Sequence, residues 1–140
     1  QHESLALGTG FLDAFRSHPA ASVLMGPEEM LAQAVAAGAH GGVSGGANIW
    51  PSLYVRLHAA AERGDGPEAA RLQAIVMDIS ANVYASEGGP NSYLRGLKCA
   101  LAELGLCGPT LAEPLEPAGE PARRRIRECL ERTGLLARAV

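Results

Sequence analysis

The sequence predicts an α/β fold in which two consecutive strand–helix units of a parallel sheet precede a segment of three helices. Short apolar runs at 22–25 and 40–44 are each followed within a few residues by a helical pattern. After the Gly-Asp-Gly-Pro stretch at 64–67, only helical patterns remain. Successive strands joined by a helix pair in parallel, because a parallel connection needs about the length of a helix.

The first strand–helix unit covers residues 22–37. Ser-Val-Leu-Met at 22–25 stands between Pro19 and Gly-Pro at 26–27 and lacks the polar alternation of a half-exposed strand, which predicts a buried parallel strand. Pro27 suits the first turn of a helix, and Glu28 and Glu29 suit its positive end. Gly38 suits the end of this helix, which we expect over 27–37.

The second unit begins with a strand candidate at 40–44, followed by Gly-Gly-Ala-Asn at 45–48. Pro51 then opens a helix that Gly64 closes. A shorter helical pattern at 11–17 precedes both units and stops before Pro19. The chain order is therefore strand, helix, strand, helix, as in consecutive units of a parallel sheet.

Three further helices are expected after residue 66, at 67–84, 92–104 and 120–133. Each has apolar residues at three- and four-residue steps along one face, and glycines follow the second and third. A loop containing three prolines separates the second helix from the third. These apolar stripes exceed what two strand–helix units can cover, so we expect this segment to contribute to an interface between subunits.

Composition limits the classes of function. The 140 residues are 47% apolar and carry a net charge of −3, with a pI near 5.8, which argues against nucleic acid as a partner. No apolar run is long enough for a membrane helix, and no signal peptide is evident, so the expected location is the cytoplasm. The three cysteines have no Cys-x-x-Cys spacing and the histidines no ligand spacing, so we expect reduced core thiols and no metal.

Four blocks of sequence occur in one order: 22–29, 38–48, 64–73 and 91–117. They are SVLMGPEE, GAHGGVSGGAN, a segment from Gly-Asp to Leu-Gln, and a segment that includes NSYLRGLKCALAELGL and AEPLEP. Together they resemble the pyruvate-dependent class I aldolases of the dihydrodipicolinate synthase and N-acetylneuraminate lyase family, over essentially the whole chain. The resemblance implies the C-terminal half of a (β/α)8 barrel, with its last two βα units at 1–64 and a helical extension at 65–140.

The chemistry of this family requires a lysine that attacks the ketone of pyruvate. The resulting iminium stabilises the carbanion formed when a carbon–carbon bond is made or broken. Counting back from Gly26 places Gln1 at or near the position of that lysine, and a glutamine amide is barely nucleophilic. Lys98, the single lysine of the chain, falls in the block that resembles the family's C-terminal helix, where no catalytic role is implied. The expectation is therefore that this chain supplies no catalytic residue and uses no cofactor.

The substrate-binding residues implied by the resemblance are Gly26, Glu28, Glu29, Val43 and Gly45, because barrel sites lie at the C-terminal ends of the strands. In the sugar-acid lyases of the family, the matching glycine and acidic pair hold substrate hydroxyls, and the matching carbonyl of Val43 faces pyruvate. Two plainer readings stay open. The glutamates can simply favour the helix dipole, and the glycines can simply permit tight turns.

Several other features carry weaker functional readings. The basic run at 123–127 offers an anion site, but Glu120, Glu128 and Glu131 on the same helix favour a solvated face of ion pairs. The glycines at 38–46 match neither nucleotide-binding pattern. Trp50, before Pro51, is expected to be an apolar anchor.

Two functions compete. In the first, the chain is part of an aldolase or lyase that acts on pyruvate and an aldehyde or 2-keto acid. It is then completed by a missing N-terminal half of the barrel and assembles into a dimer or tetramer. In the second, the chain is a non-catalytic half-barrel scaffold or oligomerisation module, since the exposed edges of a two-strand sheet demand pairing.

Overall fold

The computed structural model describes residues 10, 13–14, 18 and 20–136, and these form two compact units. The first unit reaches to Ala47 and continues over Pro51–Ala74, and the second contains Asn48–Trp50 and the chain from Ile75 onward. Gln1 and most of the helix expected at 11–17 lie outside the described residues. The predicted domain boundary between residues 64 and 65 marks the expected end of the barrel portion. The division into two units is based on contacts and does not bear on it, so this boundary stays a prediction.

The first unit contains a parallel pair of strands, β1 (Leu24–Met25) and β2 (Gly41–Gly42), in which Leu24 lies opposite Gly41. Both predicted strands are therefore confirmed as parallel neighbours, although each is only two residues long. Hydrogen bonds from the His40 amide to the Val23 carbonyl and from the Val43 amide to the Met25 carbonyl, both 2.9 Å, continue the pairing beyond each end.

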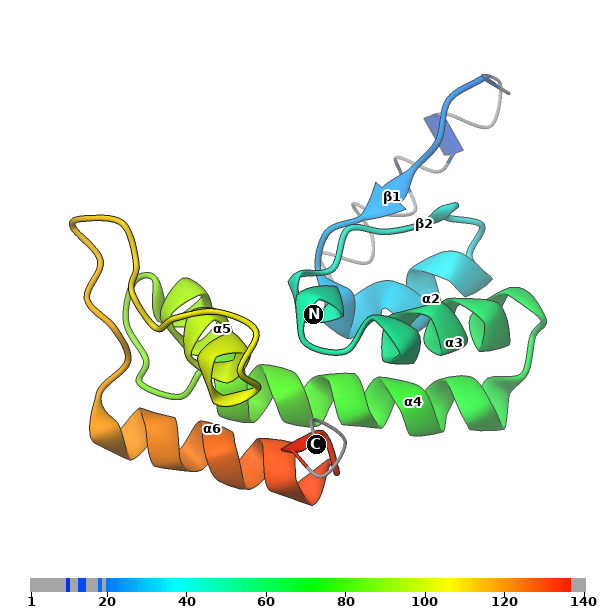
Figure 1. The fold of residues 1–140 in the computed structure, drawn as a ribbon. Coiled ribbons are helices and arrows are strands. Elements are labelled where there is room, and N and C mark those ends of the chain that lie inside the picture. The colour runs from blue at the N-terminus through cyan, green and yellow to red at the C-terminus, as the bar shows by residue number, and fades with distance from the viewer. Residues whose placement is uncertain (1–9, 11–12, 15–17, 19, 137–140) are drawn as a thin grey trace. The chain divides into compact units, whose positions relative to one another are not determined.

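Helices cover one face of this strand pair (Figure 1). The predicted helix at 27–37 is confirmed as a 3-10 turn, η1 (Glu28–Met30), that leads into α2 (Leu31–Ala36). α2 packs against both β2 and α3 (Pro51–Glu62), which begins at the expected proline. The core residues of this unit are buried aliphatic side chains, among them Leu31, Ala34, Leu53, Leu57 and Leu72.

A single turn separates α3 from α4 (Gly66–Ile79). Gly64 has a φ of +70°, in the left-handed region where a side chain is strained, so glycine is the natural residue to end α3 there. The Asp65 side chain then accepts a hydrogen bond from the Glu68 amide, at 3.2 Å, and caps the first turn of α4. The apolar stripe predicted for 67–84 is buried, and its last five residues form a π-helical turn, η3 (Ser80–Tyr84).

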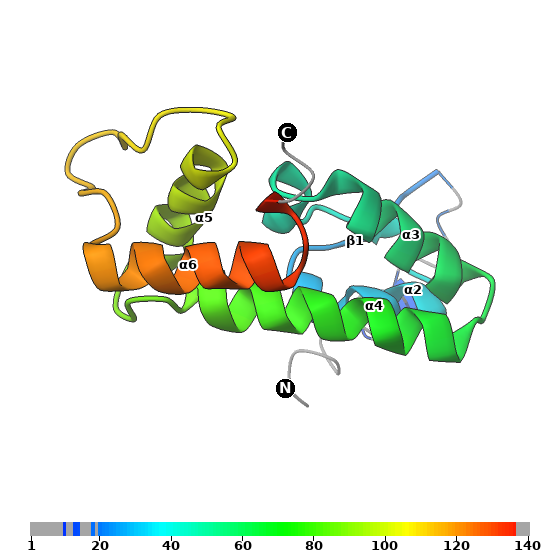
Figure 2. The same cartoon turned by 60° about the horizontal axis from the view of Figure 1, so that its bottom comes forward.

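The second unit is built from η3, α5 (Ser92–Glu103) and α6 (Glu120–Arg132), and α5 packs against both of the others (Figure 2). All three helices expected after residue 66 are confirmed. The core includes Ile79, Val83, Ala100, Ile126 and Leu130, each less than 1% exposed. Within the described ranges, no helix is long and apolar enough to cross a bilayer.

α5 makes an unusually close approach to the π-turn at Gly96. A β-carbon built on this glycine would stand 1.9 Å from the carbonyl oxygen of Val83. The hydroxyl of Ser92 strengthens the same junction by donating a 2.6 Å hydrogen bond to the Tyr84 carbonyl. The packing of these two elements therefore depends on the absence of a side chain at residue 96.

Candidate functional site

The residues that follow β1 and β2 lie at the same edge of the strand pair. The strands are parallel and in register, and the Val43 amide donates to the Met25 carbonyl across this edge. Gly26 is exposed, Val43 is 69% exposed, and Gly45 opens the short turn η2 (Gly45–Asn48). These three residues therefore follow the paired ends of β1 and β2, as predicted. Their contact with a substrate stays a prediction.

Glu28 is a buried acidic residue and is only 4% exposed. Its Oε1 accepts a 2.6 Å hydrogen bond from the Tyr54 hydroxyl, and its Oε2 accepts a 2.9 Å hydrogen bond from the Gly46 amide. A carboxylate removed from water needs such donors, because leaving it unpaired costs several kcal/mol. Glu28 thus connects the turn after β1 to the turn after β2 and to α3.

Gln73 of α4 holds the same turn from another side. Its Nε2 donates to the carbonyl of Glu28 and its Oε1 accepts from the amide of Ala32, both at 3.0 Å. The bond from the Ala32 amide satisfies a backbone donor at the start of α2 that lacks a partner within the helix, while the Glu28 carbonyl also accepts from the Leu31 amide. The sequence did not single out Gln73, Tyr54 or Gly46, because no spacing rule relates them to Glu28.

Glu29 differs from its neighbour in exposure. Its side chain is partly exposed, whereas Glu28 is buried. Both lie in the first turn of η1, so the alternative explanation through helix electrostatics concerns a three-residue 3-10 turn rather than a long helix. The two carboxylates are therefore not equivalent, although the sequence pattern treats them as one acidic pair.

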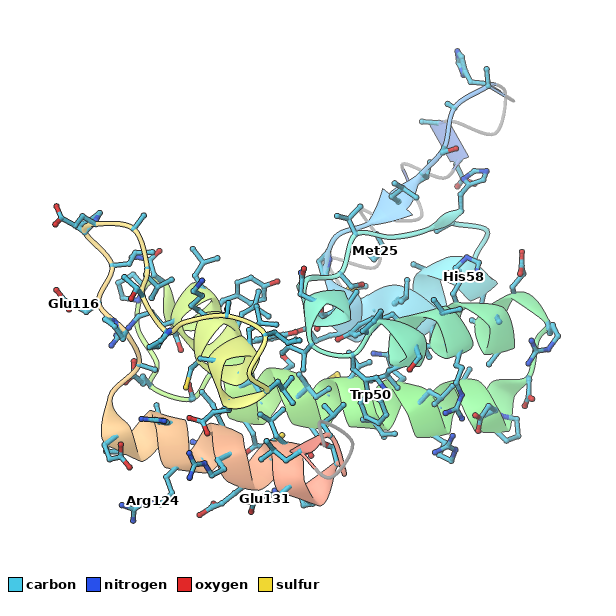
Figure 3. The ribbon with its side chains drawn as sticks, in the orientation of Figure 1. Met25, Trp50, His58, Glu116, Arg124 and Glu131 are labelled. Carbon is cyan, nitrogen blue, oxygen red and sulfur yellow. The ribbon has the colours of Figure 1, made fainter. Side chains whose placement is uncertain are left out.

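The histidines near the strands have structural contacts. His40 Nδ1 accepts a 3.0 Å hydrogen bond from the Val23 amide, and His58 Nε2 on α3 lies 3.3 Å from the His40 carbonyl (Figure 3). Among the described residues, no group of three or more His, Cys, Asp or Glu side chains gathers at one point. Lys98 is partly buried on α5, in the second unit.

Arginines of α6 form ion pairs with a neighbouring helix, and Arg123 and Arg127 keep half-exposed side chains, as expected for a solvated face. Both bind the carboxylate of Glu103 on α5, whose side chain is 5% exposed. Burial opposes ionisation of Glu103, but the hydrogen bonds from the two arginines outweigh it and lower the pKa of this carboxyl. A sheltered carboxylate is a stronger partner than the exposed glutamates of α6, because water screens it less.

Two other arginines of this helix also reach outside it. Arg132 forms an ion pair with Asp78 at 2.9 Å, and Arg125 donates to the Asn82 side chain at 3.2 Å. Arg124 instead points away from the helix (Figure 3). The face keeps a hollow of about 270 Å³, lined by Glu120, Arg123, Arg124 and Arg127. Since carboxylates already engage two of these three guanidinium groups, the structure favours a packing role for the basic run.

The three cysteines divide into two classes. Cys99 and Cys129 are buried free thiols, as expected, but Cys107 is exposed, and its assignment to the core is wrong. Cys107 lies in the loop after α5, beyond Gly105, where the helical pattern no longer applies. Burial and the charge of Asp78 raise the pKa of Cys129 to about 11. Cys99 also has a raised pKa, chiefly because of burial.

Comparisons with known proteins agree with this geometry. Residues 13–133 match the Dihydrodipicolinate synthetase family. A 4-hydroxy-tetrahydrodipicolinate synthase of Bartonella quintana is 39% identical over 101 residues, which cover 70% of this chain and 33% of that protein. An uncharacterized DapA-like lyase of Halobacterium salinarum is 33% identical over 123 residues, which cover 88% and 39%.

Solved structures show the same relationship. The chain aligns with a dihydrodipicolinate synthase of Bacteroides thetaiotaomicron with a TM-score of 0.82 and 45% identity, over 86% of this chain and 41% of that one. A sialic acid aldolase of Ruminococcus gnavus shares the fold, with a TM-score of 0.73 at 20% identity. The chain thus spans about a third to two fifths of these relatives. It is an α/β portion of their barrel fold and belongs to the Dihydrodipicolinate synthetase family.

Proposed function

We propose that the chain is the C-terminal portion of a cytoplasmic, Schiff-base-forming aldolase or lyase that acts on pyruvate and an aldehyde or 2-keto acid. The observation that supports this most directly is the family match over residues 13–133, combined with coverage of only 33–41% of the relatives' length. The two strand–helix units are, in this proposal, the last two of a (β/α)8 barrel. The three helices after residue 66 are its C-terminal extension.

The chain contributes part of the rim of the active site. Sites in such barrels are built from the loops that follow the strands, which is where Gly26, Glu28, Glu29, Val43 and Gly45 are found. In this proposal the carbonyl of Val43 faces the pyruvate moiety and the acidic pair stands where sugar-acid lyases hold hydroxyls. Glycine at 45 leaves room beside the substrate but removes a possible side-chain contact.

The catalytic amine comes from outside this chain. A lysine on another barrel strand attacks the ketone of pyruvate and expels water to form the iminium, which then serves as an electron sink. Its source is the N-terminal half of the barrel. Leu24 is 54% exposed and Val43 69% exposed on the strand pair, and we assign their cover to that half. The completed protein forms a dimer or tetramer through the helical extension.

Trapping with borohydride tests the proposal. The chain is incubated with pyruvate, alone and with the N-terminal part of the Bacteroides thetaiotaomicron relative, then reduced and analysed by intact mass and peptide mapping. We expect a three-carbon acid adduct only in the mixture, on a lysine of the added part. Mapping separates this label from any on the α-amine of Gln1. A label on Lys98 that depends on Glu28 or Gly45 contradicts the proposal.

A second candidate is a non-catalytic half-barrel that associates with itself. The observation in its favour is the two-strand sheet, because β1 and β2 pair only with each other among the described residues. Unpaired strand edges are templates for association. Sedimentation that shows a closed homo-oligomer of the chain, together with no adduct in the presence of the N-terminal part, supports this scaffold over the enzyme.

A further inference from the structure

His40 takes part in the pairing of the two strands through both its backbone and its side chain. Its amide donates to the Val23 carbonyl at 2.9 Å, and its Nδ1 accepts from the Val23 amide at 3.0 Å. Val23 directly precedes β1, and His40 directly precedes β2. The imidazole of His40 therefore supplies a hydrogen bond that extends the pairing by one residue on each strand, at the end where the strands begin.

This side-chain hydrogen bond exists in only one protonation state of His40. A neutral imidazole has one N–H donor and one acceptor nitrogen. Because Nδ1 accepts from Val23, the proton of neutral His40 is on Nε2. Protonation of the ring places a second N–H on Nδ1, so that two donors face each other and the bond is lost. Histidine is the side chain that ordinarily changes its charge between about pH 5 and 8.

His58 on α3 contacts the backbone of His40 without this sensitivity. Its Nε2 lies 3.3 Å from the His40 carbonyl oxygen, and its ring packs beside Gly41, which has no side chain in the way. An N–H on Nε2 is compatible with both the neutral and the charged ring of His58. Protonation of His58 therefore leaves its contact with the carbonyl in place.

Few other ionisable side chains surround His40. The segments 20–25 and 31–39, which include β1 and α2, contain none. On α3, Arg56 forms an ion pair with a carboxylate of α4 at 2.9 Å, and Glu62 lies one helical turn after His58. The titratable neighbours from α3 are thus His58 and Glu62, and neither contacts the Val23 amide among the described bonds.

The other end of the strand pair is held by backbone groups alone. The Val43 amide donates to the Met25 carbonyl at 2.9 Å, just beyond the end of β2. Neither group titrates in the range in which histidine does. Loss of the bond between His40 and Val23 therefore weakens one end of the strand pair and leaves the other end closed.

We propose that His40 is a proton-sensitive latch on the strand pair. The neutral ring holds the start of β1 against β2, and the charged ring releases it. The opposite end of the pair, followed by Gly26 and Val43, stays closed in both states. This inference concerns the local order of the strands and does not depend on the proposed function.

Two substitutions isolate the latch. His40→Asn keeps an acceptor, because the side-chain carbonyl oxygen of asparagine can take the place of Nδ1, but it cannot titrate. His58→Gln removes the neighbouring imidazole and leaves His40 intact. The two variants therefore separate the protonation of His40 from that of His58.

Nuclear magnetic resonance of the 140-residue chain between about pH 8 and about pH 5 tests the latch. Hydrogen exchange of the Val23 amide is corrected for the intrinsic effect of pH on exchange. We expect its protection to fall roughly two- to tenfold on acidification, as for the loss of one hydrogen bond. The chemical shift of this amide should change over the same pH range as the ring signals of His40. The Val43 amide should keep its protection.

The variants decide the source of the effect. Protection of the Val23 amide should not depend on pH in His40→Asn, and His58→Gln should behave like the parent. Amides of α6 serve as the reference for intact folding. An equal loss of Val23 protection in His40→Asn overturns the latch, and so does a Val23 shift that follows the ring signals of His18 or His58. Unchanged protection of Val23 in the parent at about pH 5 also overturns it.

Discussion

Substitution of Gly96 by alanine tests the packing of α5 against the π-turn. The new β-carbon would stand 1.9 Å from the Val83 carbonyl oxygen, whereas ordinary contacts begin at about 3.4 Å, so one backbone must retreat. Forcing extra volume into packed structure typically costs about 1–3 kcal/mol, and a rigid carbonyl places this case at the upper end. Alanine recovers about 1 kcal/mol in helix propensity. We expect a net loss of about 2 kcal/mol.

Urea unfolding followed by circular dichroism measures this change through the shift of the transition midpoint. Gly66→Ala is the matched control, because Gly66 begins α4, has no positive φ, and has nothing within 4 Å of an added β-carbon. That variant should be as stable as the parent or slightly more stable. Equal midpoints for the two variants refute the claim that residue 96 requires the absence of a side chain.

Two further outcomes follow from the charged and thiol groups. Glu103→Gln should lower the midpoint near neutral pH. The deficit should vanish as the pH falls through the folded-state pKa of Glu103, which its arginine partners lower against the opposing effect of burial. A carboxyl group with a lowered pKa stabilises the fold only while it stays ionised. Glu68→Gln is the control for this variant. The hydrogen bond from Arg71 lowers the pKa of Glu68 to about 2, but the Glu68 side chain is 31% exposed. Because water screens this ion pair, the loss of stability in Glu68→Gln should be smaller. Iodoacetamide at mildly alkaline pH should alkylate Cys107 in the native chain, but should alkylate Cys129 only after unfolding. Labelling of Cys129 in the native chain would contradict the burial that raises the pKa of this thiol.

Much of the fold could be predicted from the sequence because its signals are local. Pro51 and Gly64 bound α3 by fixing or freeing backbone angles, which needs no knowledge of neighbours. The apolar stripe of α4 reports burial through its period alone. The parallel pairing of residues 24–25 with 41–42 followed from the helix between them.

The candidate site could be predicted only in part. Gly26, Val43 and Gly45 were found because they directly follow strands, but Tyr54 and Gln73 bind Glu28 across 26 and 45 residues of sequence, and no periodicity encodes such pairs. The ion pairs between Glu103 and arginines of α6 are likewise tertiary contacts, which the spacing of residues within one helix does not predict. The apolar spacing of the preceding helix continues through the π-helical turn at 80–84. The sequence pattern therefore does not distinguish this turn from an α-helix.

The division into two units has a consequence for how the chain reaches its fold. Each unit consists almost entirely of one continuous stretch of sequence, and the pairing of Leu24 with Gly41 spans only 17 residues. Chains dominated by such local contacts fold quickly, because little loop entropy is lost before contacts form. Residues 20–74 can therefore acquire their structure on the ribosome before α6 is synthesised.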